Sequence, residues 1–133
     1  MEWSLSEEEL LPIRSEFVLA SRFGELEPPI DTVFIHIKEH NAYLKSCQNV
    51  LKLGFQGKMC IHPDQVAVTN ETFTPSEEEV VWSKRVISEF ERAEAEGVAS
   101  IQVDGYFVDY PIVEKAQRVV DMSNLLNDLA SSK

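Results

Sequence analysis

Hydrophobic residues recur at helical spacing in the first 25 positions of the chain. An acidic run at 7–9 is followed by apolar residues that fall on one side of a helix: Leu10, Leu11, Phe17, Val18 and Ala20. This spacing predicts one helix, with Pro12 either near its first turn or dividing it, and with Gly24 as its stop.

Two short apolar segments further along the chain have the character of β-strands. Residues 30–37 form a nearly continuous, β-branched run, which suits a strand that is covered on both faces. Residues 58–62 form a second candidate, which Pro63 ends because proline cannot donate a hydrogen bond to a neighbouring strand. A helix is predicted between them, with Asn41 as a candidate N-cap and Gly54 just past its end. Strand, helix and strand in this order make a βαβ unit with parallel strands.

The second half of the chain carries helix-start and turn signals. Ser76 with Glu79 matches a capping box, and Thr74 followed by Pro75 at the first helical position fits equally well as the helix start. Either start predicts a helix that continues to about Gly97. Asp104-Gly105 separates two short alternating segments, and this pair predicts a hairpin because its turn needs positive φ at both positions. A last apolar-periodic helix is expected after the hairpin.

The predicted order of elements is therefore α, β, α, β, α, hairpin, α. Two parallel strands make an unusual sheet by themselves, since parallel sheets are covered on both faces and this order has more helices than strands. The pattern predicts a portion of a larger α/β fold.

Composition and charge narrow the classes of partner. The chain has 133 residues, of which 44% are hydrophobic and 26% charged, the balance of a globular domain with a real core. Its 12 Lys and Arg against 23 Asp and Glu give a net charge of −11, which would repel phosphate backbones and anionic lipids. We therefore expect no nucleic acid and no membrane partner. No transmembrane run or signal peptide is visible, so a cytoplasmic location is expected, or a mitochondrial one if a longer precursor exists.

The two cysteines, Cys47 and Cys60, are expected to be reduced, buried and structural. A zinc site formed by Cys60, His62 and Asp64 is the competing interpretation, because alternate residues of a strand share a face. Structural zinc, however, takes four ligands at recognisable spacing, and the sequence does not provide them. We expect no metal ligands in this chain, and we expect His36 to be a hydrogen-bonded strand residue.

Residues 54–66 read Gly-Phe-Gln-Gly-Lys-Met-Cys-Ile-His-Pro-Asp-Gln-Val. This segment resembles a signature of the HpcH/HpaI aldolase superfamily, in its citrate lyase beta chain-like branch. Further motifs agree in order: Ile30-Asp31-Thr32-Val33, Phe73-Thr74-Pro75-Ser76, Asp104-Gly105 and Val108-Asp109-Tyr110-Pro111. The resemblance covers most of the chain, from about residue 10 to about residue 125.

The resemblance implies a TIM (β/α)₈ barrel of which this chain holds only the C-terminal portion. Residues 1–97 would then be the last βα units, with strands near 30–37 and 58–62, and residues 98–133 a C-terminal extension made of a β-hairpin and a helix. A complete barrel takes about 250 residues, more than this chain contains. We therefore expect an N-terminally truncated member of the branch.

The resemblance also implies a chemistry. Members of the branch cleave a carbon–carbon bond in a 3-hydroxyacyl-CoA such as citramalyl-CoA or malyl-CoA, which releases acetyl-CoA and an oxo acid. It thus implies an acyl-CoA thioester substrate and Mg²⁺, which would bind the oxo acid as Lewis acid and template. The family's metal ligands belong to earlier strands, so none is assigned here. A homo-oligomer, trimer-like as in the family, is also implied.

Asp109 matches the acidic residue of the family's Ile/Val-Asp-x-Pro motif and is the predicted catalytic residue. In the family this residue reaches the active site of a neighbouring subunit, where it donates or accepts a proton at the acetyl carbon. Local sequence alone favours an N-cap, because an Asp two residues before Pro111 suits the start of a helix. The two roles are compatible.

Met59, Cys60 and Ile61 are the predicted substrate-binding residues, because the active sites of such barrels lie at the C-terminal ends of the strands. By resemblance, they present backbone and side chains to the acyl-CoA thioester arm. Packing in the barrel interior explains Met59 and Ile61 equally well.

The leading hypothesis is that the chain alone is inactive or nearly so, because the metal-binding strands are absent. A first alternative is a non-catalytic interaction module that pairs its strand edges with a second copy or another chain. A second alternative is one piece of a split enzyme, complemented by a separate N-terminal chain.

Overall fold

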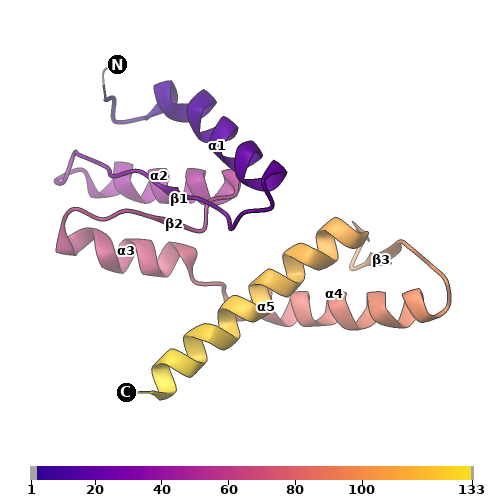
Figure 1. Cartoon of the computed structure of the whole chain (residues 1–133). Helices are drawn as coiled ribbons and strands as arrows, with labels where there is room; N and C mark the ends of the chain where they lie inside the picture. The colour runs from indigo at the N-terminus through magenta and orange to yellow at the C-terminus, as the bar shows by residue number, and fades with distance from the viewer. Residues whose placement is uncertain (1–2, 133) are drawn as a thin grey trace. The chain divides into compact units, whose positions relative to one another are not determined.

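The computed structural model describes residues 3–132 and divides the chain into two compact units, Met1–Phe73 and Thr74–Lys133 (Figure 1). The division lies earlier than the boundary after residue 97 that we expected. The reason is that the helix over 77–95 shares a core with the hairpin and the last helix. Which of these parts belongs to a barrel and which to an extension stays a prediction.

The first unit is a βαβ unit with helices added at both ends. Its elements are η1 (Glu8–Leu10), α1 (Leu11–Phe23), β1 (Ile30–Asp31), α2 (His40–Leu53), β2 (Gly57–Lys58) and α3 (Pro63–Phe73). The two strands pair in parallel, with Ile30 opposite Gly57 and Asp31 opposite Lys58, which confirms the predicted topology. Figure 1 shows them side by side, with α1 and α3 on opposite sides.

The parallel ladder is shorter than predicted. We expected strands over 30–37 and 58–62, but β1 ends at Asp31 and β2 at Lys58. One more backbone bond, from the Met59 amide to the Asp31 carbonyl at 3.0 Å, extends the pairing, and the chain after β1 then turns. The apolar run marks a core contact rather than a ladder, because Phe34 is buried against Tyr43 and Cys47. A continuous apolar run has no period that separates these two cases.

The helix ends of this unit follow most of the local signals. Pro12 lies in the first turn of α1, and Gly54 ends α2 in the left-handed conformation at φ 108°, both as predicted. The prediction of Asn41 as the N-cap of α2 was wrong. The helix begins at His40, and Glu39 occupies the cap position without a side-chain hydrogen bond.

Helix α3 had no counterpart among the predicted elements. Its two buried residues are Gln65 and Thr69, which are four positions apart but both polar. A search for apolar periodicity therefore finds no inward face here. The remaining signals were Pro63 at the start and Asp64 in the first turn, both typical of a helix N-terminus.

The second unit comprises α4 (Glu77–Ala95), β3 (Ile101–Val103), β4 (Tyr106–Val108) and α5 (Tyr110–Ser131). The capping box is confirmed: Ser76 Oγ accepts the Glu79 N–H at 3.2 Å, and the Glu79 carboxylate accepts the Ser76 N–H at 2.9 Å. The hairpin is also confirmed, with positive φ at Asp104 (50°) and Gly105 (85°). The core of the second unit contains Val86, Phe90, Val103, Val108 and Ala116.

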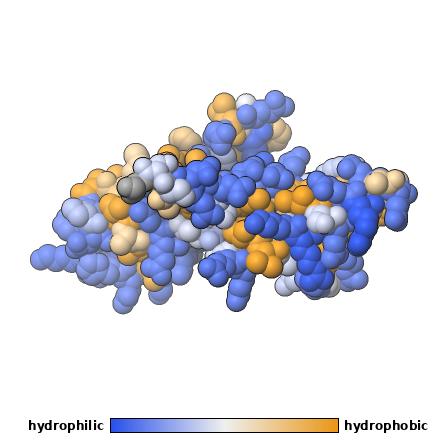
Figure 2. Space-filling view, turned by 90° about the horizontal axis from the view of Figure 1, so that it is seen from below, coloured by the Kyte–Doolittle hydropathy of each residue, from blue (hydrophilic) through white to orange (hydrophobic). Residues whose placement is uncertain are grey.

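Both units leave apolar side chains at the surface. Figure 2 shows hydrophobic residues in patches between hydrophilic ones on the face seen from below. None of the helices within residues 3–132 combines the length and the apolar character needed to cross a bilayer.

The two cysteines differ in burial. Cys47 is fully buried, as expected, and both thiols are free. Cys60 is exposed, which contradicts the expectation that both are buried. It lies two residues past the end of β2, where the ladder no longer covers the chain.

The first unit is expected to lose stability at alkaline pH. Burial raises the pKa of the Tyr43 phenol and of the Cys47 thiol. In the unfolded chain these groups ionise near pH 10 and 8.5, about their ordinary values. Because a raised pKa favours the protonated form in the folded state, the stability that it contributes is present below these values and lost as pH rises above them. Urea unfolding followed by circular dichroism from pH 7 to 11 measures this loss.

Tyr43→Phe is the control for this experiment. The variant loses the hydrogen bond of Tyr43 to Thr69 at every pH, but its stability should fall less steeply above pH 10 than that of the unmodified chain. Equal slopes for the two proteins in this range would contradict the assignment to Tyr43.

Candidate functional site

The three predicted substrate-binding residues follow directly after β2, yet they occupy different environments. Met59 is 50% exposed and lies on the wall of a cleft. The Cys60 side chain instead contacts Tyr43 and Thr69. Ile61 is 49% exposed, and its backbone amide is bound by Gln65. The three residues therefore do not share one surface: Met59 faces the cleft, Cys60 contacts two polar side chains, and the Ile61 amide is hydrogen-bonded to Gln65. Their role in substrate binding stays a prediction.

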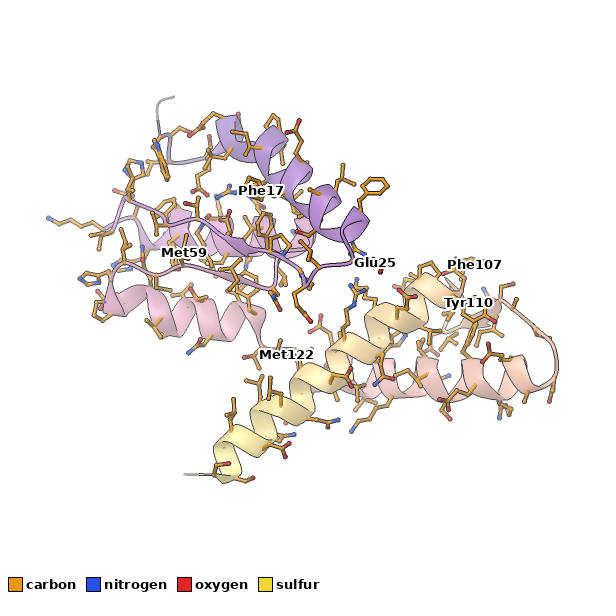
Figure 3. The ribbon with its side chains drawn as sticks, viewed as in Figure 1. Phe17, Glu25, Met59, Phe107, Tyr110 and Met122 are labelled. Atoms are coloured by element: carbon orange, nitrogen blue, oxygen red, sulfur yellow. The ribbon has the colours of Figure 1, made fainter. Side chains whose placement is uncertain are left out.

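The cleft beside Met59 lies between α1 and the two strands and has a volume of about 270 Å³. Phe17 on α1 and Met59 beside β2, both labelled in Figure 3, are among the residues that line it. Its walls are mostly apolar and its polar residues are Arg14, Asp31 and Thr32; the others are Leu10, Ile13, Phe17, Ile30, Phe55 and Met59. A cleft of this size and character accepts an apolar group, such as a side chain or a short acyl segment.

Arg14 and Asp31, which line the cleft, belong to a network of buried charges. Arg14 donates two hydrogen bonds to Asp31, from Nε and Nη2, both at 2.8 Å, and a third from Nη2 to Glu7 at 2.9 Å. Lys58 donates to Asp31, and the Ser46 hydroxyl donates to Glu7. Two acids and two bases thus share one site, with a net charge of zero.

Each charge in this network is stabilised by its partners. Desolvation lowers the pKa of Arg14, but the adjacent Asp31 and Glu7 outweigh it and raise the pKa above the ordinary value. Glu7 Oε1 is buried without a hydrogen bond, with Lys58 Nζ 3.9 Å away. Because the charges already neutralise one another, the network is a brace between η1, α1, α2 and the strands rather than a set of groups open to a charged ligand.

A second polar cluster joins α2, α3 and the segment that follows β2. The buried Tyr43 hydroxyl is 2.6 Å from Thr69 Oγ1, which is 3.3 Å from the Cys60 sulfur. His36 is hydrogen-bonded, with Nε2 3.0 Å from the Trp3 carbonyl oxygen, but it lies after the end of β1 and is not the strand residue that was expected. The cluster fixes the direction of the Cys60 side chain at the end of β2.

Gln65 is a buried site residue that was not singled out from the sequence. Its Oε1 accepts the Ile61 N–H at 2.9 Å, and its Nε2 donates to the Phe34 carbonyl at 3.0 Å. The available signal was the motif, since Gln65 lies in the same segment, 54–66, as the three predicted residues. Its position on the inner side of a helix was not available, because α3 was not predicted.

Asp109 lies in the second unit, where it is the N-cap of α5. Its Oδ1 accepts the Ile112 N–H at 3.4 Å, and the residue is half-buried. The N-cap role is therefore confirmed. The cap uses one carboxylate oxygen, which leaves the second oxygen for another proton. The catalytic role stays a prediction.

Residues 3–132 contain no group of three or more His, Cys, Asp or Glu side chains that could hold a metal ion. His62 and Asp64 approach each other, with Nδ1 and Oδ2 3.6 Å apart, but as a surface pair. Glu7 and Asp31 already neutralise Arg14 and Lys58. The residues present therefore do not fit a Mg²⁺ site.

No family model matches the chain, but comparison with curated proteins finds relatives that are named as lyases. The chain is 33% identical over 126 residues to the citrate lyase subunit beta of Leuconostoc mesenteroides. The aligned region covers 95% of this chain and 41% of the relative. It is 28% identical over 121 residues to the mitochondrial citramalyl-CoA lyase of Rattus norvegicus, covering 91% of this chain and 36% of the relative. The chain thus spans about two fifths of the length of these relatives.

Comparison with solved structures also finds proteins named as citrate lyases or CitE. The structure matches that of the CitE protein of Mycobacterium tuberculosis, solved in complex with magnesium, acetoacetate and coenzyme A. The TM-score is 0.71 at 22% identity, and the match covers 88% of this chain and 42% of that one. At this identity the likeness concerns the fold alone.

Proposed function

The chain belongs to the citrate lyase beta-like branch, and on this premise we propose that it supplies part of a lyase that cleaves a carbon–carbon bond in a 3-hydroxyacyl-CoA. Citramalyl-CoA and malyl-CoA are the substrate class, with acetyl-CoA and an oxo acid as products. The observation that carries the proposal is sequence identity, over nearly the whole chain, to a citrate lyase subunit beta and to a citramalyl-CoA lyase.

We place β1 and β2 among the last strands of a TIM barrel, and the hairpin with α5 in a C-terminal extension. The parallel pairing of the strands and the likeness to CitE support this placement. The exposed apolar residues that line the cleft, among them Phe17, Ile30 and Met59, would then pack in the closed barrel or face its substrate.

In this proposal, Asp109 exchanges a proton with the acetyl carbon, and Met59, Cys60 and Ile61 contact the thioester arm. Asp109 is suited to its part because the cap holds one carboxylate oxygen in place while the second oxygen can meet a proton. Mg²⁺ enters only as the family's cofactor, and its ligands are expected outside residues 3–132.

A chimera tests the proposal. In the rat citramalyl-CoA lyase, the segment that matches this chain is replaced by the residues of this chain, and cleavage of citramalyl-CoA is measured with Mg²⁺. We expect the chimera to be active, and the 133-residue chain alone to be inactive, because residues 3–132 offer no group of side chains that could hold the metal ion. Activity of the chain alone would contradict the second expectation. A folded chimera that binds citramalyl-CoA but does not cleave it would contradict the first.

The alternative function is an interaction module or one piece of a split enzyme. The specific observation in its favour is the exposed apolar surface of the first unit, with Phe17 61% and Ile30 60% exposed. Size-exclusion chromatography with light scattering distinguishes the cases. A stable homo-oligomer of the chain supports association, and a monomer at high concentration counts against self-association.

A further inference from the structure

Gln65 connects the ends of the two parallel strands. The residue lies in the first turns of α3 and is 3% exposed. Its side-chain oxygen binds the amide of Ile61, after β2, and its side-chain nitrogen binds the carbonyl of Phe34, after β1. One amide group thus holds two backbone segments that are distant in sequence.

The strands themselves do not make this connection. The parallel ladder ends with the bond from the Met59 amide to the Asp31 carbonyl, so the segments beyond it lack a direct backbone pairing. A primary amide has one acceptor and one donor group, which are the two groups that an N–H and a carbonyl need. Gln65 therefore replaces a ladder bond at the place where the strands separate.

Thr69 holds the same segment from the next turn of α3. Its hydroxyl donates to the main-chain carbonyl oxygen of Gln65 at 2.9 Å and lies 3.3 Å from the Cys60 sulfur. The helix therefore contacts the segment at two successive residues, the side chain of Cys60 and the backbone of Ile61.

We propose that Gln65 is a positioning residue that holds the backbone of residues 59–61 for the acyl-CoA thioester arm. The inference rests on the proposed function, which assigns that segment to the substrate. Gln65 itself touches the segment from its inner side and not the substrate.

Three variants of the 133-residue chain test the positioning. Gln65→Leu keeps a similar volume but removes both hydrogen bonds, and Gln65→Glu keeps the acceptor while its carboxylate cannot donate to Phe34. Asn70→Leu is the matched control, because it makes the same change of amide to hydrocarbon at an exposed position of the same helix. The readouts are hydrogen exchange of the Ile61 amide and the rate of alkylation of Cys60.

For Gln65→Leu we expect the exchange of the Ile61 amide to rise about tenfold or more, and Cys60 to react faster, while the amides of α2 keep their protection. Asn70→Leu should leave both readouts unchanged. An unchanged Ile61 amide would overturn the proposal. An equal rise throughout the first unit would overturn it as well, since it would show general destabilisation.

Gln65→Glu adds a readout that a purely structural role would not move. In Gln65→Glu the carboxylate still accepts the Ile61 N–H, so the protection of that amide should stay close to that of the unmodified chain, but the Phe34 carbonyl loses its donor. A protonated glutamic acid has a donor and an acceptor like glutamine, so the loss of stability relative to the unmodified chain, measured by urea unfolding, should shrink on acidification. A stability difference that does not shrink at low pH would count against the pairing with Phe34.

The chimera separates this inference from the proposed function. If the unmodified chimera cleaves citramalyl-CoA, Gln65→Leu should raise KM more than it lowers kcat, because the substrate-binding backbone is affected rather than the proton transfer. If the chimera folds and binds but is inactive, the proposed function fails, while the exchange data still decide whether Gln65 holds the segment.

Discussion

Asp109→Asn is expected to lower kcat/KM of the chimera for citramalyl-CoA by about 10²- to 10⁴-fold, the usual contribution of a general acid or base. Asparagine is as good an N-cap as aspartate and keeps an oxygen for the Ile112 amide, so the helix start should be unaffected. The amide, however, cannot exchange a proton at the acetyl carbon. Steady-state kinetics and thermal unfolding of the same protein measure the two effects separately.

Two further variants make the result specific to Asp109. Asp121→Asn makes the same chemical change at an exposed position of α5 and should keep full activity. Asp109→Ala removes the cap as well and should cost about 1 kcal/mol of stability in addition to activity. An Asp109→Asn chimera with activity close to the parent would restrict this residue to its capping role.

Asp31→Ala should destabilise the first unit by about 3–5 kcal/mol, because it leaves two buried cations with one remaining carboxylate. Asp31 accepts two hydrogen bonds from Arg14 and one from Lys58, and its side chain is 2% exposed. The measurement is the protection of the Met59 amide, which donates to the Asp31 carbonyl, together with urea unfolding of the chain.

An exposed ion pair in the second unit provides the comparison. Glu89→Ala breaks the pair of Arg85 and Glu89, in which the Arg85 side chain is 52% exposed, and should cost less than about 1 kcal/mol. If Asp31→Ala were as mild as Glu89→Ala, the buried network would not be the brace that its geometry indicates.

Local signals predicted the elements whose geometry is decided within a few residues. The capping box at Ser76 and Glu79, the Asp104-Gly105 turn and the left-handed Gly54 are all present. Each depends on a backbone conformation or a hydrogen bond between near neighbours, so the residue types alone are sufficient evidence.

Features that depend on distant partners were predicted less well. The strand expected over 30–37 ends at Asp31, because a ladder needs a paired neighbour along its whole length and β2 provides only a short one. Helix α3 was not predicted, because its buried residues Gln65 and Thr69 are polar and find their partners on other elements. Cys60 was expected to be buried, but its position past the end of β2 leaves it exposed.

The same distinction applies to the candidate site. Asp109 and the segment of Met59, Cys60 and Ile61 were identified by motif, and the structure adds how each is held. The charge network was not predicted, because Glu7, Arg14, Asp31 and Lys58 are separated by up to 51 positions and no periodicity links them.

The amino-acid sequence by itself determined the family, the parallel βαβ arrangement and the hairpin. Motifs and the stereochemistry of neighbouring residues can be recognised without knowing which distant segments pack against them. Only the tertiary structure decided where the ladder stops, which carboxylates neutralise Arg14 and Lys58, and that Gln65 joins the two strand ends. These depend on contacts between segments far apart in the chain. A buried polar group takes whichever partner the folded backbone brings within hydrogen-bonding distance.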